Sequence, residues 1–362
     1  MKKLLRRAKR FKGFTIGLDL HKRWIWYTVM DVRGNEVAAA KIEASREAIL
    51  ALFAVWRKKG AVQVAFEASG CFVWVFDMLA QELGHDCVHV AQAAKIAAIA
   101  NSREKNDAND AWWLAYLLWD GRLPEAFVAE GALRELRIAG RELRSYTDQR
   151  SDLVRRVRSH LAQEGVSLPK GWHTSRLKRD AARLAIQAIA GLRGKALQEL
   201  YEQVIQVSAV IERWRKQVTM LCKEFPAIKT IQAEIPGMKD ITAGLVYGEL
   251  GDPARYRSQK AYAKATGLTP GSRISGGKQQ QQSISRAGSR HARWALTRAV
   301  IACLRCTRRS VGVQVRTWVE KQCTRQKCKR KVVVAAARKL AEGVWRLLAW
   351  GEAFDLRRAF PA

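Results

Sequence analysis

Short apolar runs separated by turns make up the first part of the chain. FTIGLD from residue 14, WIWYTVMD from residue 24 and EVAAAKIE from residue 36 are rich in β-branched, aromatic and alternating apolar residues, and Arg33-Gly34-Asn35 is a turn sequence between the last two. This pattern predicts three strands joined as an antiparallel meander.

Helices and strands then alternate. The pattern predicts a helix over about residues 44–58, the strand VQVAFE ending at residue 67, a helix over about 72–83, the strand CVHVA from residue 87 and helices from about 106. The order β-β-β-α-β-α-β-α is typical of an α/β layered sandwich. It is also the order of the ribonuclease H superfamily.

The middle of the chain, residues 131–226, is predicted to be helical and rich in arginine, with a loop at 164–176. Its apolar positions alternate steps of three and four at Leu197, Leu200, Val204, Val207, Ile211, Trp214, Val218 and Leu221. This heptad seam, which ends at Pro226, predicts a coiled coil or a long antiparallel hairpin. The apolar seam would pack either against a second copy of the chain or against other helices of the same chain.

The remaining residues, 227–362, are predicted to form a second compact region. IPGMKDITAGLVYGEL, from residue 235, resembles a helix-hairpin-helix element, the glycine-rich segment 266–290 is expected to be a flexible cationic loop, and basic helices follow. The predicted divisions are therefore a basic arm (1–13), an α/β domain (14–130), a helical coiled-coil region (131–226) and a mostly α-helical C-terminal domain (227–362).

The charge of the chain indicates a polyanionic partner. Lys and Arg number 65 against 33 Asp and Glu, which gives a formal net charge of +32. Nucleic acid is the commonest partner of such a chain, and an anionic membrane surface is the alternative. No apolar run approaches the roughly 18 residues that a membrane span needs. The basic N-terminus lacks the features of a signal peptide and is interpreted as a nucleic-acid-binding arm or a solvated tail.

The seven cysteines, in a chain without a secretion signal, indicate reduced thiols and a cytoplasmic protein. Cys303, Cys306, Cys323 and Cys328 have nearly the spacing of a zinc ribbon. The first pair, however, lies in a sequence that reads as a helix, where cysteines are ordinary small apolar residues. We favour that interpretation over structural zinc.

Four carboxylates suggest a metal site. Asp19 and Glu67 end predicted strands among apolar neighbours, where an unpaired carboxylate is costly to bury. Asp107 and Asp110 lie three residues apart on one face of a predicted helix. Such a set suits Mg²⁺, and two Mg²⁺ ions can promote phosphodiester displacement. From spacing alone, the Asp pair is more often a solvated helix face or an N-cap pair.

A serine in the glycine-rich segment suggests different chemistry. Ser275 stands in RISGGK beside two glycines and two cations, and a serine in such a loop could attack a phosphodiester if a base removes its proton. Ser272, Ser283 and Ser285 are competing candidates. From the residues alone, a loop that only grips phosphate is the better interpretation, and the loop departs from a Walker A motif.

Taken together, these motifs resemble one family, the DEDD transposases of the one-ten family of insertion sequences, which are bridge-RNA-guided serine recombinases. The resemblance runs from about residue 14 to 355. It rests on IGLDLHK (from 16), FEASG (66), KNDANDA (105), IPG (235), GLTP (267), SGGK (275), ISRAG (284) and RKLA (338).

The resemblance implies a RuvC-like N-terminal domain in which Asp19, Glu67, Asp107 and Asp110 bind Mg²⁺ or Mn²⁺. It also implies that Ser275 forms a covalent phosphoserine link to DNA, in a site completed by another subunit of a dimer or tetramer. Donor DNA, target DNA and a guide RNA would be the partners of a cytoplasmic, nucleoid-associated protein. We assign nucleic-acid contacts to Lys105, Arg273, Gly276, Gly277, Lys278, Arg286 and Arg290. A metal-dependent junction nuclease and a non-catalytic nucleic-acid-binding protein are the alternatives.

Overall fold

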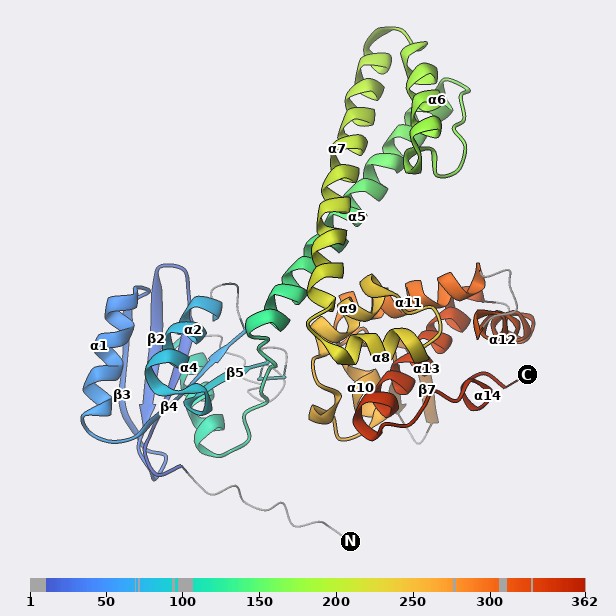
Figure 1. The fold of residues 1–362 in the computed structure, drawn as a ribbon. Coiled ribbons are helices and arrows are strands. Elements are labelled where there is room, and N and C mark those ends of the chain that lie inside the picture. The colour runs from blue at the N-terminus through green and yellow to red at the C-terminus, as the bar shows by residue number, and fades with distance from the viewer. Residues whose placement is uncertain are drawn as a thin grey trace. The chain divides into compact units, whose positions relative to one another are not determined.

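The computed structural model describes residues 11–68, 70, 72–92, 95–96, 107–275, 278–305, 311–326 and 328–361. By internal packing the chain forms two compact units, residues 1–128 and 129–362 (Figure 1). No helix among the described residues is long and apolar enough to cross a membrane. The boundary between the units falls close to the one expected at residue 130.

The first unit is built on a five-stranded sheet. Its strands are β1 (Phe14–Leu20), β2 (Trp24–Met30), β3 (Glu36–Glu43), β4 (Val62–Glu67) and β5 (Val88–Ala91). The order across the sheet is β3-β2-β1-β4-β5, with β1, β2 and β3 antiparallel and with β4 parallel to both β1 and β5. The predicted meander and the predicted order of elements are confirmed.

Helices cover both faces of this sheet. α1 (Arg46–Arg57) and α2 (Phe72–Leu83) pack on one face, where their apolar residues share a core with Ile16, Leu18 and Phe66. The short helix η1 (His85–Cys87) leads into β5. On the other face α4 (Asp107–Trp119) covers a smaller core that contains Ala65, Ala91 and Leu114. The result is the layered α/β sandwich that the sequence predicts.

A close contact at Gly17 fixes where α4 crosses the sheet. Side chains alternate between faces along a strand, so Gly17 faces α4 while Ile16 and Leu18 face the opposite core. A Cβ atom at Gly17 would lie 2.0 Å from the Ala111 carbonyl oxygen and 2.5 Å from the Ala115 amide nitrogen. Only glycine permits this approach of helix backbone to strand.

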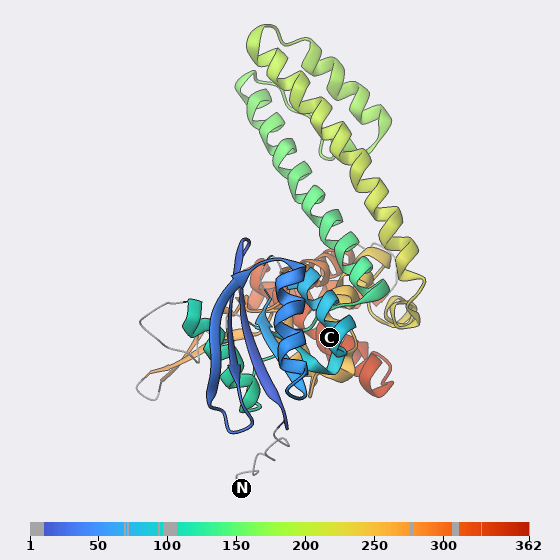
Figure 2. The same cartoon turned by 90° about the vertical axis from the view of Figure 1, so that its left-hand side faces the viewer.

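The second unit begins with a helical arm. α5 (Gly131–Gln163) and α7 (Gly191–Cys222) run side by side as an antiparallel hairpin, with η2 (Trp172–Thr174) and α6 (Arg176–Gln187) packed against its end (Figure 2). The heptad residues of α7 are buried or partly buried in the core of the unit. The intramolecular alternative is therefore confirmed. Because α5 covers the seam, self-association would have to use another surface.

The remaining elements continue the same core. They are α8 (Pro226–Glu234), α9 (Asp240–Leu250), η3 (Pro253–Arg255), α10 (Gln259–Ala265), β6 (Pro270–Ser275), β7 (Lys278–Ile284), α11 (Arg290–Leu304), α12 (Val311–Gln326), α13 (Lys329–Trp350) and α14 (Leu356–Ala359). Arm residues and C-terminal helices belong to a single cluster of buried side chains. By packing, the expected middle and C-terminal regions are thus parts of one unit.

The glycine-rich segment differs from the prediction of a flexible loop. β6 and β7 pair as an antiparallel hairpin in which Ser275 lies opposite Lys278 and Arg273 opposite Gln280. Glycine and glutamine make this stretch look irregular in sequence, because neither has high strand propensity. Cross-strand pairing supplies the order, and the pairing partner lies several residues away along the chain.

A buried carboxylate joins the arm to the C-terminal helices. Glu249, at the end of α9, has a side chain only 6 % exposed and accepts hydrogen bonds from the Arg141 guanidinium at 2.6 and 3.1 Å. The Ser289 hydroxyl donates to it at 2.9 Å, and Arg137 donates to the Gly248 and Glu249 carbonyls. Burial raises the pKa of Glu249, but these hydrogen bonds outweigh burial and hold the pKa below its ordinary value of 4.5.

Gly17→Ala should destabilise the first unit by about 1–3 kcal/mol, because the added methyl group forces α4 away from β1. Gly60→Ala is the matched control, since a Cβ there meets only the Phe14 ring at 3.5 Å. Urea unfolding of both variants measures the difference. Equal stability of the two variants would contradict the close contact.

Glu249→Gln should lower the unfolding free energy of the second unit by about 2–3 kcal/mol at neutral pH, because it leaves Arg141 without its charged partner. A carboxyl with a lowered folded pKa stabilises above its unfolded pKa, and this contribution disappears as the pH falls through the folded pKa. Urea unfolding over a pH series should therefore show wild type and variant converging below pH 4.5. Glu199→Gln, at an exposed site on α7, should change little at any pH. A constant gap across the series would contradict this role.

Candidate metal centre and serine hairpin

Asp19 lies at the carboxyl end of β1, directly below the first turn of α4. It is two residues from Gly17, so its side chain leaves the strand on the same face that α4 covers. The close contact at Gly17 therefore brings the start of α4 over Asp19. The Asp19 side chain is only 17 % exposed.

Three potential metal ligands converge at this point. Asp19, His21 and Asp107 each offer one ligand atom, and these atoms lie within 4.8 Å of one another. The His21 Nε2 atom is 2.8 Å from the Asp19 Oδ2 atom and 3.6 Å from the Asp107 Oδ1 atom. Among the described residues this is the only such group of three or more acidic, histidine or cysteine side chains.

Asp110 and Glu67 lie beside this group. Asp110 is in the first turn of α4, and its charge acts on Asp19. Leu18 and Phe66 are opposite each other in the parallel pairing of β1 and β4, so Asp19 and Glu67 follow at the same sheet edge. Glu67 is two residues from Ala65, which is buried under α4, so Glu67 also faces α4.

The pKa of the Asp19 carboxyl is raised by its surroundings. Burial raises the pKa of the Asp19 carboxyl, the His21 hydrogen bond opposes this, and the charges of Asp107 and Asp110 raise it further. Carboxylate oxygens with one imidazole nitrogen form a donor set suited to a divalent cation, which would neutralise the crowded negative charge. The residues present therefore fit a divalent metal ion.

His21 is the one member of the group that sequence reasoning missed. The histidines show no metal-binding spacing in the sequence. The available signal was alternation, because His21 follows Asp19 by two positions at the end of a strand and returns to the same face. The structure holds its ring by stacking on Trp24, with ring centroids 3.8 Å apart, and by the backbone hydrogen bond from His21 to the Trp24 carbonyl.

Ser275 is placed by the backbone of the second unit. It ends β6 at the tip of the hairpin, and the adjoining Gly276 and Gly277 lie outside the described residues, as does Lys105. For Arg273 and Lys278 the structure describes the backbone pairing alone. The first ten residues of the expected basic arm are likewise outside the described part.

The base of the hairpin is held by a compact set of backbone contacts. Ser285 donates its amide to the Thr269 carbonyl at 2.9 Å, and Arg293 donates to the Thr266 carbonyl at 3.0 Å. Gly267 has a φ of +68°, and a Cβ there would meet the Arg293 guanidinium at 2.4 Å. Arg286 adopts a φ of 54°, which is uncommon for a residue with a side chain. Arg286 and Arg290 are both exposed beside this base.

The cysteines with nearly zinc-ribbon spacing form no cluster of metal ligands in the described part of the chain. Cys303 is buried on α11, while Cys323 on α12 and Cys328 before α13 are partly buried. Cys306, the fourth residue of the spacing, lies outside the described residues. The three described thiols do not join in a cluster of ligands.

Comparisons with known proteins match both units. Residues 16–165 match a family model described as a transposase, the DEDD transposase domain of IS110, and residues 230–312 match the model of the IS116/IS110/IS902 transposase family. A family 20 transposase of Pseudomonas aeruginosa is 25 % identical over 351 residues, which cover 92 % of this chain and 96 % of that protein.

Two further relatives carry similar names. The transposase y4pF/y4sB of Sinorhizobium fredii is 27 % identical over 94 % of this chain and 85 % of its own length. The transposase of insertion sequence element IS1328 of Yersinia enterocolitica is 33 % identical over 33 % of this chain and 36 % of its own length. From these two matched regions, the chain belongs to the IS110/IS116 family of insertion-sequence transposases.

Proposed function

We propose that this insertion-sequence transposase cuts and exchanges DNA strands with a divalent metal held by its acidic cluster and a nucleophile supplied by Ser275. The observation that carries the proposal is the meeting of Asp19, His21 and Asp107 within 4.8 Å in a chain of net charge +32. A cluster of this sign makes sense in a DNA-processing protein if it recruits a cation that lets a phosphate approach.

The proposed ligands are Asp19 and Asp107, with Glu67 and Asp110 beside them at the same sheet edge. A bound Mg²⁺ or Mn²⁺ would polarise a phosphodiester oxygen and offset the charge that develops on it. His21 donates a hydrogen bond to Asp19 or gives its own nitrogen to the ion, and its stacking on Trp24 holds it ready for either role.

In the proposed chemistry, the Ser275 hydroxyl oxygen attacks a phosphodiester of DNA. One oxygen–phosphorus bond forms, one backbone phosphorus–oxygen bond breaks, and the leaving sugar oxygen takes up a proton. Reversal with a different sugar hydroxyl joins a new strand and frees the serine, so exchange needs no external energy source. Support comes from the place of Ser275 at the end of β6, opposite Lys278 in the pairing with β7.

A guide RNA and a dimeric or tetrameric working form belong to the same proposal. Their support is the resemblance of the motifs and the basic charge of the chain. In such a system base pairing would select the DNA, while the protein would contact backbone and shape. The heptad seam lends no support to the oligomer, because α5 covers it.

Mg²⁺ or Mn²⁺ should raise the thermal unfolding midpoint of the full chain, because an ion that binds only the folded state stabilises it. The rise should be lost in Asp19→Asn and Asp107→Asn. Asp86→Asn, an exposed carboxylate on η1, should keep it. Each variant is compared with and without ion by calorimetry, since removing a buried charge also changes the baseline. An undiminished rise in Asp19→Asn would place the ion elsewhere.

Ser275→Ala should abolish any covalent protein–DNA adduct formed on DNA that carries the ends of its insertion sequence, while DNA binding persists. Denaturing gels detect the adduct. Ser283→Ala on β7 is the matched control and should retain it. Cleavage at full rate in Ser275→Ala would favour a nuclease in which water attacks, and loss of adduct only in Ser283→Ala would reassign the nucleophile.

Protein purified from its native cells for the adduct experiment also tests whether a guide RNA is required. A discrete small RNA that copurifies with the protein, and whose removal stops adduct formation, supports guidance. Full adduct formation by RNA-free protein would overturn guidance while leaving the serine assignment intact.

A further inference from the structure

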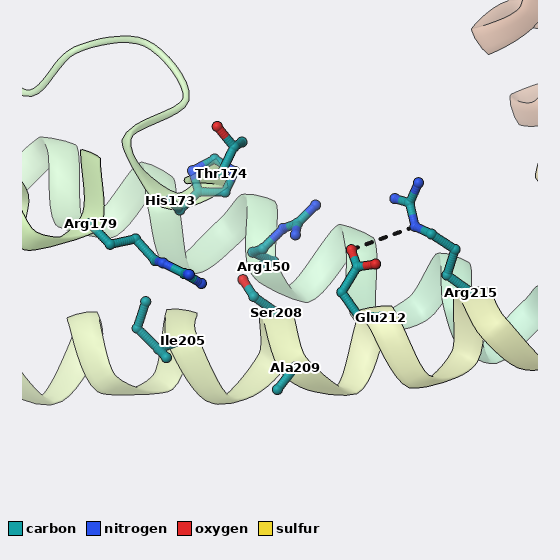
Figure 3. A pocket seen from close by; sticks show the side chains of 9 residues that line it. All are labelled: Arg150, His173, Thr174, Arg179, Ile205, Ser208, Ala209, Glu212 and Arg215. Atoms are coloured by element: carbon teal, nitrogen blue, oxygen red, sulfur yellow. Dashed lines mark ion pairs between the residues drawn. The ribbon is translucent and has the colours of Figure 1, made fainter. Parts of the chain in front are cut away.

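A cavity of about 500 Å³ opens on the helical arm, far along the chain from the acidic cluster and from Ser275. Its walls come from four elements, α5, η2, α6 and α7 (Figure 3). The polar side chains that matter here are Arg150, His173, Arg179, Ser208, Glu212 and Arg215. Neither family motif nor proposed chemistry uses any of them.

Positive charge in this cavity exceeds negative charge. Three guanidinium groups reach it from three different helices, and Glu212 is the one carboxylate among its lining residues. Glu212 pairs with Arg215 at 3.6 Å. Within the described residues, the Arg150 and Arg179 guanidinium groups make no ion pair and no hydrogen bond. Burial and the charge of Arg215 lower the pKa of Arg150, and the charge of Glu212 opposes them only in part.

His173, on η2, is the histidine in the wall of this cavity. Its Nδ1 atom is buried and has no hydrogen-bond partner in the described part of the chain. A buried polar atom left unpaired costs about 1–3 kcal/mol, but this atom is closed to solvent, so the His173 ring lines the cavity without offering Nδ1 to a ligand. Burial lowers the pKa of His173, and Arg150 and Arg158 lower it further, so the ring already feels the cationic surroundings.

The packing of the arm makes these groups available for a ligand. The apolar side of α7 is used by its contact with α5, and η2 is anchored by Trp172, which is fully buried. Trp172 also stacks on Tyr201 of α7, with ring centroids 5.7 Å apart. His173, the next residue, is thereby held at the cavity wall by a rigid neighbour.

A neighbouring cavity of about 510 Å³ extends the site along α6. It shares Arg179 and Ile205 with the first cavity and adds Arg176 and Arg183. Two acids, Asp180 and Glu202, also line it, so the first cavity is the more positive of the two. Arg179 therefore lines both of two adjoining cavities. This arrangement suits the successive phosphates of a polymer backbone better than a single phosphate ion.

We propose that the arm cavity binds a phosphate group of a nucleic-acid backbone, with Arg150 and Arg179 as its contacts and the His173 ring as part of its wall. Guanidinium groups match phosphate oxygens with paired, charge-assisted hydrogen bonds. The proposal does not depend on the metal centre or on Ser275, because the cavity is lined by other residues.

The shared chemistry is a phosphate group, and two sources can supply it. A polymer backbone brings successive phosphates, whereas free phosphate or a mononucleotide brings one. Inorganic phosphate tests whether the cavity takes the group at all. A short single-stranded RNA and a DNA duplex of arbitrary sequence test whether the group comes from nucleic acid.

Inorganic phosphate, compared with chloride at equal ionic strength, should raise the thermal unfolding midpoint of the full chain. The rise should disappear in Arg150→Gln and in Arg179→Gln. Arg156→Gln removes the same charge from an exposed site on α5, and Lys178→Gln removes one from α6, so both should keep the rise. Circular dichroism confirms that each variant is folded. Two cavity variants guard against the misfolding of either one.

Oligonucleotide affinity, measured by fluorescence anisotropy over a series of salt concentrations, should fall about tenfold or more in the two cavity variants. The slope of log affinity against log salt should become shallower by about one, as expected when one phosphate contact is lost. The two control variants should show less than about a twofold loss.

Three outcomes would overturn the proposal in different ways. Loss of affinity equal in cavity and control variants would mean that the arm contributes only diffuse charge. A phosphate-dependent rise in the unfolding midpoint with unchanged oligonucleotide affinity would assign the cavity to free phosphate. An absent effect of phosphate together with unchanged affinity would leave no anion site. Because the assay measures binding without catalysis, its result is separate from that of the Ser275 experiment.

Discussion

The close approach of α4 to β1 at Gly17 is the constraint on which the candidate metal centre depends. A helix can lie this near a strand only where the strand has no Cβ, and Ala111 and Ala115 keep the helix side equally small. The contact sets the height and position of the first helical turn over the sheet. Asp107 and Asp110 then reach the sheet edge where Asp19 and Glu67 emerge. The glycine positions the site without taking part in it.

The position of the start of α4 helps to explain how several carboxylates can lie close together. The start of a helix carries partial positive charge, which favours the carboxylates of Asp107 and Asp110 in its first turn. Asp19 receives a hydrogen bond from His21, yet burial and its acidic neighbours still raise its pKa. The fold therefore brings these groups together at an electrostatic cost that a bound cation would relieve.

In the second unit, a buried carboxylate is instead surrounded by cationic and hydrogen-bonding groups. Glu249 is surrounded by Arg141, Ser289 and the Arg137 contacts to backbone carbonyls, so one buried acid organises several cations where the arm meets the C-terminal helices. Farther along the arm, Arg150 and Arg179 make no ion pair among the described residues, although Glu212 lines the same cavity. The contrast separates arginines that build the unit from arginines that are available to a ligand. It also shows why the total charge of +32 does not reveal which arginines have that role.

Much of the fold was open to prediction because its signals are local. Strand alternation, turn residues and the heptad seam are read over a few neighbouring positions, and they identified the order of elements in the first unit and the helical hairpin of the second. Asp19, Glu67, Asp107 and Asp110 were also singled out from their places at element ends, and their role as metal ligands stays a prediction. The glycine-rich segment was predicted wrongly, since the pairing that orders β6 and β7 is not encoded in the propensities of glycine and glutamine.

By itself, the sequence determined which residues could carry chemistry and which elements they stand on. Only the tertiary structure decided which of them meet. The His21 ring lies beside Asp19 and Asp107 at the end of β1, where it stacks on the Trp24 ring. In the arm, one cavity is lined by Arg150, His173 and Arg179 from three different elements. The heptad seam faces α5 within the same chain for the same reason. Periodicity gives the face of an element, but contact depends on the path of the chain between elements and on the close packing that brings their faces together.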